Sequence, residues 1–428
     1  MNPLTALDHA HLWHPFTQQL DWVRSEPLIV DKAEGCWLID VDGRRYLDGV
    51  SSLWTNVHGH RVPQIDAAVR EQLDRVAHST MLGLTHPPAI RLAERLVKAA
   101  PEGLNRVFYS DNGSTATEVA LKMAFQYQQQ VGQTRRTRFA SLSDAYHGDT
   151  LGAVSVGAID LFHQVYRPLL FDAVALPAPL TPGGEEEQAC LTRALELLDA
   201  HADELACLIV EPLVQGAAGM KMHSPAFLRA VTERARSHGA LIAVDEVATG
   251  FGRTGTLFAS EQAGVTPDFL CAAKGIAAGN LSLAATLTTE RVYEAFLAEP
   301  DRFKQFFHGH TFTGNPLACA AALANLDLFE SQDLLAHVAR LAEALAEGLA
   351  ELRTLDGVRG TRQTGVMVGI DLADDAHGAG HRAAMRAREY GAILRPLGNT
   401  LVINPPLALS LSECAQLLQA TRLAITSE

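Results

Sequence analysis

A chain of 428 residues with 47% hydrophobic residues can bury an extensive interior and usually divides into domains. Its formal net charge of −14 argues against a general nucleic-acid or membrane-surface binder, because either function favours a basic surface. No apolar run reaches the roughly 18 residues that a membrane-spanning helix needs, and Met1–Ala10 does not resemble a secretion signal. Six cysteines without CxxC spacing favour reduced thiols over disulfides or a zinc site, so we expect a cytoplasmic, globular protein without a metal.

Short apolar segments alternate with amphipathic ones through most of the chain, which predicts an α/β fold with a mostly parallel central sheet. The N-terminal part has a hairpin signal, Asp42–Gly43, and short strand candidates at Leu28–Val30 and Cys36–Asp40. Buried strands are then expected at Arg106–Ser110, Arg138–Leu142, Cys207–Val210, Leu241–Val244 and Phe269–Ala272. Apolar residues at helical spacing predict helices at Ser114–Gln130 and Ala226–His238. The stretch Pro177–Gly184, followed by Glu185–Glu187, is typical of a surface loop.

The pattern changes after about residue 330. A long helix is expected at Asp333–Arg353, then short strands at Gly365–Ile370 and Leu401–Ile403, and a last helix from Ser412. We therefore expect a large domain over residues 61–329, with a smaller α/β domain built from residues 1–60 and 330–428 of the two chain ends.

Two charged residues are expected at one edge of the central sheet. Lys274 follows the apolar segment Phe269–Ala273, and burial there favours the neutral amine, the form that builds Schiff bases. Asp245 closes the segment Ala240–Val244, where a carboxylate can pair with a protonated pyridine nitrogen. Taken singly, each residue has an ordinary explanation. Lys274 could be a lysine whose amine reaches solvent, and Asp245 could be a helix cap or a loop residue.

An anion site and an aromatic residue are expected at the same edge. Asp111–Thr115 joins a strand to a helix, and a helix N-terminus with small residues binds phosphate through its free amides. This segment matches neither the GxxxxGK[ST] loop nor the GxGxxG fingerprint. Tyr146 follows the strand Arg138–Leu142 and is suited to stacking on a planar cofactor. Alone, Asp111–Thr115 could be an ordinary helix cap and Tyr146 a partly buried tyrosine. Together with Lys274 and Asp245 they make four elements on strand ends, and this combination predicts a cofactor site.

These residues resemble the class III aminotransferases, fold-type-I enzymes that use pyridoxal 5′-phosphate. The resemblance covers nearly the whole chain and is most specific in Leu241–Gly255 (LIAVDEVATGFGRTG) and Pro267–Gly275 (PDFLCAAKG). It implies that the following residues bind the cofactor: Lys274 covalently, Asp245 at the pyridine nitrogen, Val247 beneath the ring, Tyr146 above it, and Gly113 and Ser114 at the phosphate. It also implies that Thr311 reaches the phosphate in the neighbouring subunit, so that a homodimer shares its active sites.

Within the family, the markers are similar to the biotin-pathway branch, which converts 8-amino-7-oxononanoate to 7,8-diaminononanoate. They are Leu12–Thr17, Gly49–Trp54, His58–His60, Asp144–Thr150 and Leu394–Gly398. The resemblance assigns Arg395 to the carboxylate of the oxo acid, and a planar guanidinium suits that role. Ala248 stands where many members have a glutamine that bonds the cofactor phenol, and Glu211 is expected to shape the entrance or the cofactor pocket.

The amino donor is the point at which the resemblance divides. Most of this branch uses S-adenosylmethionine and a smaller part uses lysine. The substrate-binding set implied here is Phe16, Trp54, Tyr146, Lys274, His310 and Arg395. Leu53, Phe16 and His310 replace a tryptophan, a tyrosine and a proline of the usual adenosylmethionine-type pattern. Loss of aromatic area weakens cation–π and stacking contacts, which favours lysine. We expect S-adenosylmethionine, with lysine as the alternative.

Three other functions stay open from the sequence. One is a different class III omega-aminotransferase, and another is an isomerase of the same fold, such as glutamate-1-semialdehyde aminomutase, which needs no separate donor. The third, from a different class, is a nucleotide-dependent oxidoreductase, but the chain lacks the glycine fingerprint that such a protein usually carries.

Overall fold

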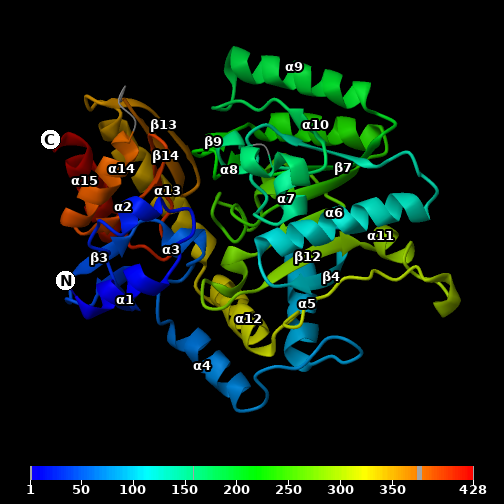
Figure 1. Ribbon diagram of the computed structural model, residues 1–428, viewed down its shortest axis with the longest axis horizontal. Coiled ribbons are helices and arrows are strands. Elements are labelled where there is room, and N and C mark those ends of the chain that lie inside the picture. The colour runs from blue at the N-terminus through cyan, green and yellow to red at the C-terminus, as the bar shows by residue number, and fades with distance from the viewer. Residues whose placement is uncertain (1, 158, 374–377, 428) are drawn as a thin grey trace.

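The largest sheet has seven strands in the order β4-β12-β11-β10-β7-β5-β6 (Figure 1). The computed structural model describes residues 2–157, 159–373 and 378–427. Five neighbouring strands, β11 to β6, are parallel, whereas β12 is antiparallel to both β11 and β4. The strands are β4 (Leu104–Ser110), β5 (Arg138–Leu142), β6 (Ala173–Leu176), β7 (Leu205–Val210), β10 (Leu241–Asp245), β11 (Phe269–Ala272) and β12 (Ala284–Thr289). The expected mostly parallel α/β fold is confirmed.

The sheet is buried on both faces, which explains why its strands are continuous apolar runs and do not alternate with polar residues. In β10, Leu241 and Ala243 belong to the hydrophobic cluster that includes residues of α6 (Gly113–Gln130). The intervening Ile242 and Val244 belong to the cluster that includes residues of α10 (Pro225–Ser237). The bounds expected for the five strands and these two helices are confirmed to within two residues.

Helix α9 (Gly184–Ala200) packs against α10 and lies outside it in Figure 1. The prediction that Glu185–Glu187 continue a surface loop is wrong, since all three lie in the first turn of α9. Carboxylates at this position stabilise a helix because its N-terminus carries a partial positive charge.

Both ends of the chain lie on the same side of the molecule, away from the large sheet (Figure 1). They share a four-stranded sheet of order β1 (Val30–Glu34), β2 (Trp37–Asp40), β3 (Arg45–Asp48) and β15 (Ala392–Ile393). A second sheet has the order β13 (Val358–Thr364), β14 (Met367–Leu372), β17 (Thr400–Ile403) and β16 (Arg395–Leu397). The helices of this part are α13 (Leu334–Leu352), α14 (Ala379–Glu389) and α15 (Leu411–Thr426). The domain boundaries at residues 60 and 330 stay a prediction.

The remaining elements connect these sheets or lie at the chain start. The helices are α1 (Pro3–His11), α2 (Gln19–Trp22), α3 (Ser51–Trp54), α4 (Pro63–Leu73), α5 (Pro87–Ala99), α7 (Leu151–Ser155), α8 (Asp160–His163), α11 (Glu290–Glu294) and α12 (Pro316–Ser331). Short 3₁₀ turns are η1 (Gln164–Leu169), η2 (Ala259–Ala263), η3 (Lys274–Ala277) and η4 (Pro300–Arg302), and β8 (Val214–Gln215) pairs with β9 (Lys221–Met222). Within the described residues no helix is both long enough and apolar enough to cross a membrane.

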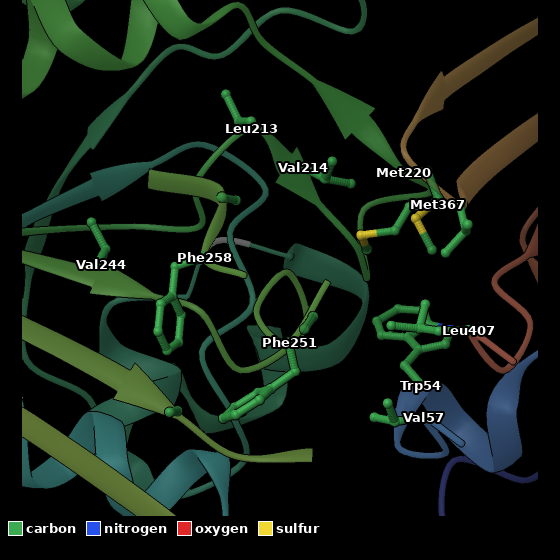
Figure 2. Close-up of a cluster of buried hydrophobic side chains, with 14 of the residues drawn as sticks. Trp54, Val57, Leu213, Val214, Met220, Val244, Phe251, Phe258, Met367 and Leu407 are labelled. Atoms are coloured by element: carbon green, nitrogen blue, oxygen red, sulfur yellow. The ribbon is translucent and has the colours of Figure 1, made fainter. Parts of the chain in front are cut away.

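One buried hydrophobic cluster joins the chain ends to the region of the large sheet (Figure 2). Trp54 and Leu407 come from the two ends of the chain, whereas Val214, Val244 and Phe251 come from the part that contains the large sheet. Because these side chains are buried together, the short helix α3 that carries Trp54 is fixed relative to the strands of the large sheet.

Candidate active site

A cavity of about 430 Å³ lies at the carboxyl ends of the parallel strands. Its polar lining includes residues that follow four different strands: Tyr146 after β5, Glu211 after β7, Asp245 at the end of β10, and Lys274 after β11. Carboxyl ends of parallel strands meet at one edge of a sheet, which is where α/β proteins bind ligands. The predicted convergence of these residues is therefore present in the fold.

Lys274 is the first residue of η3 and has a left-handed backbone, with φ of 44°. Its Nζ lies 4.6 Å from the centroid of the Trp54 ring, within the range of a cation–π contact. Burial lowers the pKa of Lys274 to about 8, although the charges of Asp245 and Glu211 act in the opposite direction. About a tenth of this amine is therefore neutral, and hence nucleophilic, at pH 7, far more than for an ordinary lysine.

Asp245 is held by two donors and is only 4% exposed. His147 Nδ1 lies 2.7 Å from Asp245 Oδ2, and the backbone N–H of Val247 donates to Oδ1 at 3.0 Å. The carboxylate accepts in the first contact, so Nδ1 carries the proton. The other imidazole nitrogen, Nε2, is buried and has no hydrogen-bond partner among the described residues. The pair is suited to hold a negative charge in place within the cavity.

The N-terminus of α6 lies at the cavity and is suited to bind an anion. Asn112 and Thr115 form a capping box, in which Asn112 Oδ1 accepts the N–H of Thr115. The first-turn amides of Gly113 and Ser114 have no intrahelical acceptor, which leaves them for an anion. A Cβ at Gly113 would lie 2.6 Å from Val247 Cγ1, so only glycine allows this close approach.

Gly148 and Ser114 place the loop after β5 against this helix end. Gly148 has a φ of 123°, and a Cβ there would lie 2.1 Å from Ser114 Oγ. Ser114 Oγ accepts the backbone N–H of Asp149 at 3.1 Å, and the hydroxyl of Tyr146 donates to Asp149 Oδ2 at 2.7 Å. Burial raises the pKa of Tyr146 well above its ordinary value, so the phenol stays protonated. Tyr146 thus presents a neutral ring at the cavity.

A second cavity of about 390 Å³ adjoins the first, and Ala217 lines both. Its lining includes Arg395 and the aromatic rings of Phe16 and Phe162, whose centroids are 5.3 Å apart. The Nε of Arg395 is buried without a hydrogen-bond partner among the described residues. The site thus combines apolar walls with a guanidinium N–H that can bind a carboxylate.

Two predicted residues do not line either cavity. Thr311 is exposed on the segment that precedes α12. His310 Nδ1 lies 2.8 Å from Asp111 Oδ2, and Asp111 lines the first cavity. The role of Thr311 in a neighbouring subunit stays a prediction.

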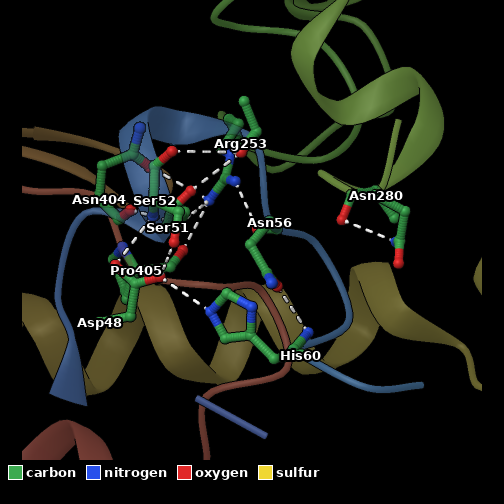
Figure 3. Close-up of polar contacts among 12 residues, drawn as sticks. Asp48, Ser51, Ser52, Asn56, His60, Arg253, Asn280, Asn404 and Pro405 are labelled. Carbon is green, nitrogen blue, oxygen red and sulfur yellow. Dashed lines mark hydrogen bonds and ion pairs between the residues drawn. The ribbon is translucent and has the colours of Figure 1, made fainter. Parts of the chain in front are cut away.

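Sequence reasoning missed Arg253, which is 1% exposed and forms hydrogen bonds with both ends of the chain (Figure 3). It donates to the carbonyl oxygens of Asn56 and Pro405, each at 2.6 Å, and to Ser51 Oγ at 3.0 Å. Burial lowers the pKa of Arg253 to about 9. The sequence signal for this network is an arginine placed between Gly252 and Gly255, close to the end of an apolar strand.

This network fixes an unusual turn beside the cavity. The four residues of α3, Ser51–Trp54, all have positive φ, between 47° and 74°. Asp48 accepts hydrogen bonds from the N–H and the hydroxyl of Ser52, at 2.8 and 2.7 Å (Figure 3). Left-handed backbone costs energy for residues other than glycine and persists where the surroundings impose it. Here the surroundings hold Trp54 beside Lys274.

The aminotransferase class-III family model matches residues 21–425. The chain belongs to this family. Among curated relatives of the family, an adenosylmethionine-8-amino-7-oxononanoate aminotransferase of Nitratidesulfovibrio vulgaris is 53% identical over 99% of this chain and 81% of its own length. A relative of the same name from Geobacter sulfurreducens is 51% identical over 95% of this chain and 93% of its own length.

Solved structures of family members have the same fold. The adenosylmethionine-8-amino-7-oxononanoate aminotransferase of Methanocaldococcus jannaschii superposes with a TM-score of 0.95 at 40% identity, covering 99% of this chain and 98% of that one. A PLP-bound amine transaminase from an uncultivated Pseudomonas species gives 0.91 at 37% identity, covering 97% and 98%. The fold-type-I assignment is confirmed.

The residues of the first cavity fit pyridoxal phosphate, the cofactor of this family. The fit rests on three features: a lysine of lowered pKa, a carboxylate held by two donors, and a helix N-terminus at which a side chain on Gly113 would block close approach. Among residues 2–157, 159–373 and 378–427, no group of three or more His, Cys, Asp or Glu side chains is placed to hold a metal ion.

Proposed function

We propose that this aminotransferase converts 8-amino-7-oxononanoate to 7,8-diaminononanoate in biotin biosynthesis. The observation that carries the proposal is the pair of adjoining cavities, one with Lys274 and Asp245 and the other with Arg395 between apolar walls. That arrangement suits a long, aliphatic oxo acid whose carboxylate lies away from the reacting carbon. The names of relatives that are 53% and 51% identical give the same substrate.

Five residues are proposed to hold the cofactor through non-covalent contacts. Gly113 and Ser114 bind its phosphate through backbone amides, and Asp245 pairs with its ring nitrogen. Val247 and Tyr146 line the cavity and are assigned to the two faces of the ring. When bound, pyridoxal phosphate supplies the aldehyde that takes up the amino group and the ring that spreads developing negative charge.

Lys274 is proposed to have two roles. Its neutral Nζ would hold the cofactor covalently, and the free amine would act as the base that holds or moves a proton at the substrate carbon. The lowered pKa of this amine, about 8, suits a base that works near neutral pH. Asp245 would pair with the ring nitrogen, and His147 orients Asp245 through its contact with Oδ2.

The acceptor is held at its carboxylate and along its chain. Arg395 binds the carboxylate, because a guanidinium with an unpaired buried N–H gains most from an anionic partner. Phe16 and Phe162 flank the aliphatic chain, which removes apolar surface from water.

For the amino donor we propose S-adenosylmethionine, in agreement with the relatives' names. Trp54 lines the first cavity and offers an indole to the sulfonium, whereas Phe16 lies in the second cavity and His310 outside both. A half-reaction tests the choice: each donor is added alone to cofactor-loaded enzyme, and the visible absorption band is followed. If lysine converts the enzyme and S-adenosylmethionine does not, the donor is lysine and the acceptor assignment is unchanged.

A homodimer with shared active sites is part of the proposal. The segment around Thr311 exposes large aromatic side chains, with Phe303 and Phe307 each 70% exposed and Phe312 58% exposed. Exposed apolar side chains of this size are typical of a surface that another protein covers. A second copy of the chain is the partner that would place Thr311 at a neighbouring phosphate. A cytoplasmic location stays a prediction.

The complete reaction tests the proposed function. Purified enzyme with pyridoxal phosphate, 8-amino-7-oxononanoate and S-adenosylmethionine should form 7,8-diaminononanoate, measured by mass spectrometry. An isomer of 8-amino-7-oxononanoate that forms without any donor would indicate an isomerase. Loss of the acceptor without the diamine product would rule out this transamination.

A further inference from the structure

Glu211 is a second buried carboxyl group at the cavity, and the steps above do not use it. It follows β7 and lines the cavity together with Asp245 and Lys274. Its Oε1 accepts the backbone N–H of Tyr146 at 3.0 Å, and its Oε2 accepts the backbone N–H of Gly216 at 3.1 Å. One carboxyl group therefore links the loop after β5 to the loop after β7.

The loop at Gly216 is itself packed against Trp54, which also lines the cavity. A Cβ at Gly216 would lie 2.8 Å from Trp54 Cζ3, so the backbone and the indole are in close contact. Through its two oxygens Glu211 is thus connected to Tyr146 directly and to Trp54 through Gly216. Both residues line the cavity, and each lies on a loop or turn outside the sheet.

We propose that Glu211 is a positioning residue that clamps the loops after β5 and β7 and so holds Tyr146 and Trp54 at the walls of the cofactor cavity. The inference rests on the proposed function only in taking pyridoxal phosphate as the molecule that the walls enclose. Glu211 acts through these two aromatic residues and needs no contact of its own with a substrate.

The chemistry of the clamp requires a carboxyl group. Two N–H donors from different loops each use a separate oxygen, and a carboxylate is the side-chain group that offers two acceptor oxygens. A glutamine of the same shape has one acceptor oxygen and one NH₂ group, so one backbone N–H would face another donor. Burial raises the pKa of Glu211 to about 7, while the charge of His147 and the two N–H donors act in the opposite direction.

Glu246 is a matched control for this experiment. It is also fully buried, and its oxygens accept the N–H groups of Ala259 at 3.0 Å and Ser260 at 2.8 Å and the hydroxyl of Thr249 at 2.6 Å. Burial raises the pKa of Glu246 to about 7 as well. It follows Asp245 in the chain but does not line the cavity. Replacing either glutamate disturbs a buried carboxyl group, but only Glu211 is connected to Tyr146 and Trp54.

The experiment compares Glu211→Gln and Glu246→Gln with the wild-type holoenzyme. Two quantities are measured: the rate at which pyridoxal phosphate is released on dilution, and the visible circular dichroism of the bound cofactor, which reports how rigidly it is held. Thermal unfolding of the cofactor-free proteins records general loss of stability. We expect both variants to unfold at lower temperature, with release at least tenfold faster and a weaker dichroic band only in Glu211→Gln.

Each outcome bears on the inference separately from the proposed function. Wild-type release rate and dichroism in Glu211→Gln would overturn the clamp, as would equal loss in Glu246→Gln. If Glu211→Gln does not fold, Glu211→Asp takes its place, since it keeps both oxygens on a shorter arm. An intermediate release rate supports the clamp, and a rate equal to that of wild type overturns it. A wild-type protein that binds no pyridoxal phosphate would instead contradict the proposed function.

Discussion

His147 and Asp245 form a buried pair in which Nδ1 lies 2.7 Å from Oδ2, although the two residues are 98 positions apart in the chain. His147 follows β5 and Asp245 ends β10, and these two strands are separated in the sheet by β7. A charged carboxylate in a buried site is stable only when it is hydrogen-bonded or paired. The imidazole supplies that hydrogen bond and leaves the other oxygen of Asp245 directed by Val247 N–H.

Replacement of Asp245 by Asn should leave cofactor binding largely intact and slow turnover strongly. The change removes the charge that keeps the ring nitrogen protonated while preserving the shape of the side chain. Breaking a buried charge pair costs about 3–5 kcal/mol, and each 1.36 kcal/mol of barrier is about tenfold in rate. We therefore expect kcat to fall by about 10² or more in steady-state assays. Near-normal kcat in Asp245→Asn would show that the ring nitrogen needs no such partner.

Replacement of His147 by Leu should lower kcat by about 10- to 100-fold, because a hydrogen bond to a charged group is worth about 1.5–3 kcal/mol. The effect should act through Asp245, so that His147→Leu causes little further loss in an Asp245→Asn background. A double-mutant cycle measures this coupling. Additive losses from the two replacements would indicate that His147 acts independently.

The attachment of pyridoxal phosphate to the cofactor-free protein should accelerate with pH up to about 8 and then level off. The reacting species is the neutral amine of Lys274, whose pKa burial lowers to about 8. Below that pH the neutral fraction falls tenfold per unit. Stopped-flow absorption measures the rate, and Lys274→Ala is the control that should form no stable band. A rate that keeps rising to pH 10, the ordinary range of a lysine, would contradict the lowered pKa.

Replacement of Arg395 by Gln should affect the two half-reactions differently if Arg395 serves the oxo acid. We expect KM for 8-amino-7-oxononanoate to rise about 10- to 100-fold, because a charge-assisted hydrogen bond contributes about 1.5–3 kcal/mol. Conversion of cofactor-loaded enzyme by the donor should change less. Phe162→Ala, which removes apolar wall and keeps the charge, should raise KM for the acceptor by a smaller factor. Unchanged acceptor KM in Arg395→Gln would reject the assigned role.

A mixture of Lys274→Ala and Thr311→Ala variants should recover activity when their subunits exchange. If Thr311 serves the neighbouring site, each hybrid dimer contains one site with both residues intact. Activity should approach about one quarter of wild type, because half of a random mixture is hybrid and each hybrid has one intact site of two. Hybrids that form, as shown by differently tagged subunits, but stay inactive would contradict a shared site.

The sequence predicted those parts of the fold and site that depend on local pattern. The central strands are apolar runs because both sheet faces are covered, and their ends carry Tyr146, Asp245 and Lys274. A motif of fixed spacing was enough to place these residues at one edge. The antiparallel strand β12 was not predicted, because nothing in its composition distinguishes it from a parallel strand.

The rest of the site depends on contacts between distant segments, which spacing alone does not reveal. His147 lies next to Tyr146 in the chain, yet its role appears only when β5 and β10 are placed on either side of β7. Arg253 lies inside the family stretch, but its partners Asn56 and Pro405 come from opposite ends of the chain. Family resemblance assigned roles to ligand-binding residues and left these supporting contacts unassigned.

The buried guanidinium of Arg253 makes the beginning and the end of the chain interdependent. Shortening the C-terminal region as far as Pro405 would remove one acceptor of Arg253 and free the turn that carries Trp54, some 350 positions earlier in the chain. A truncation near the C-terminus would thus make the position of Trp54 beside Lys274 less fixed. For protein engineering, residues 404–405 do not line the cavity, yet their contacts with Arg253 support the turn that carries Trp54.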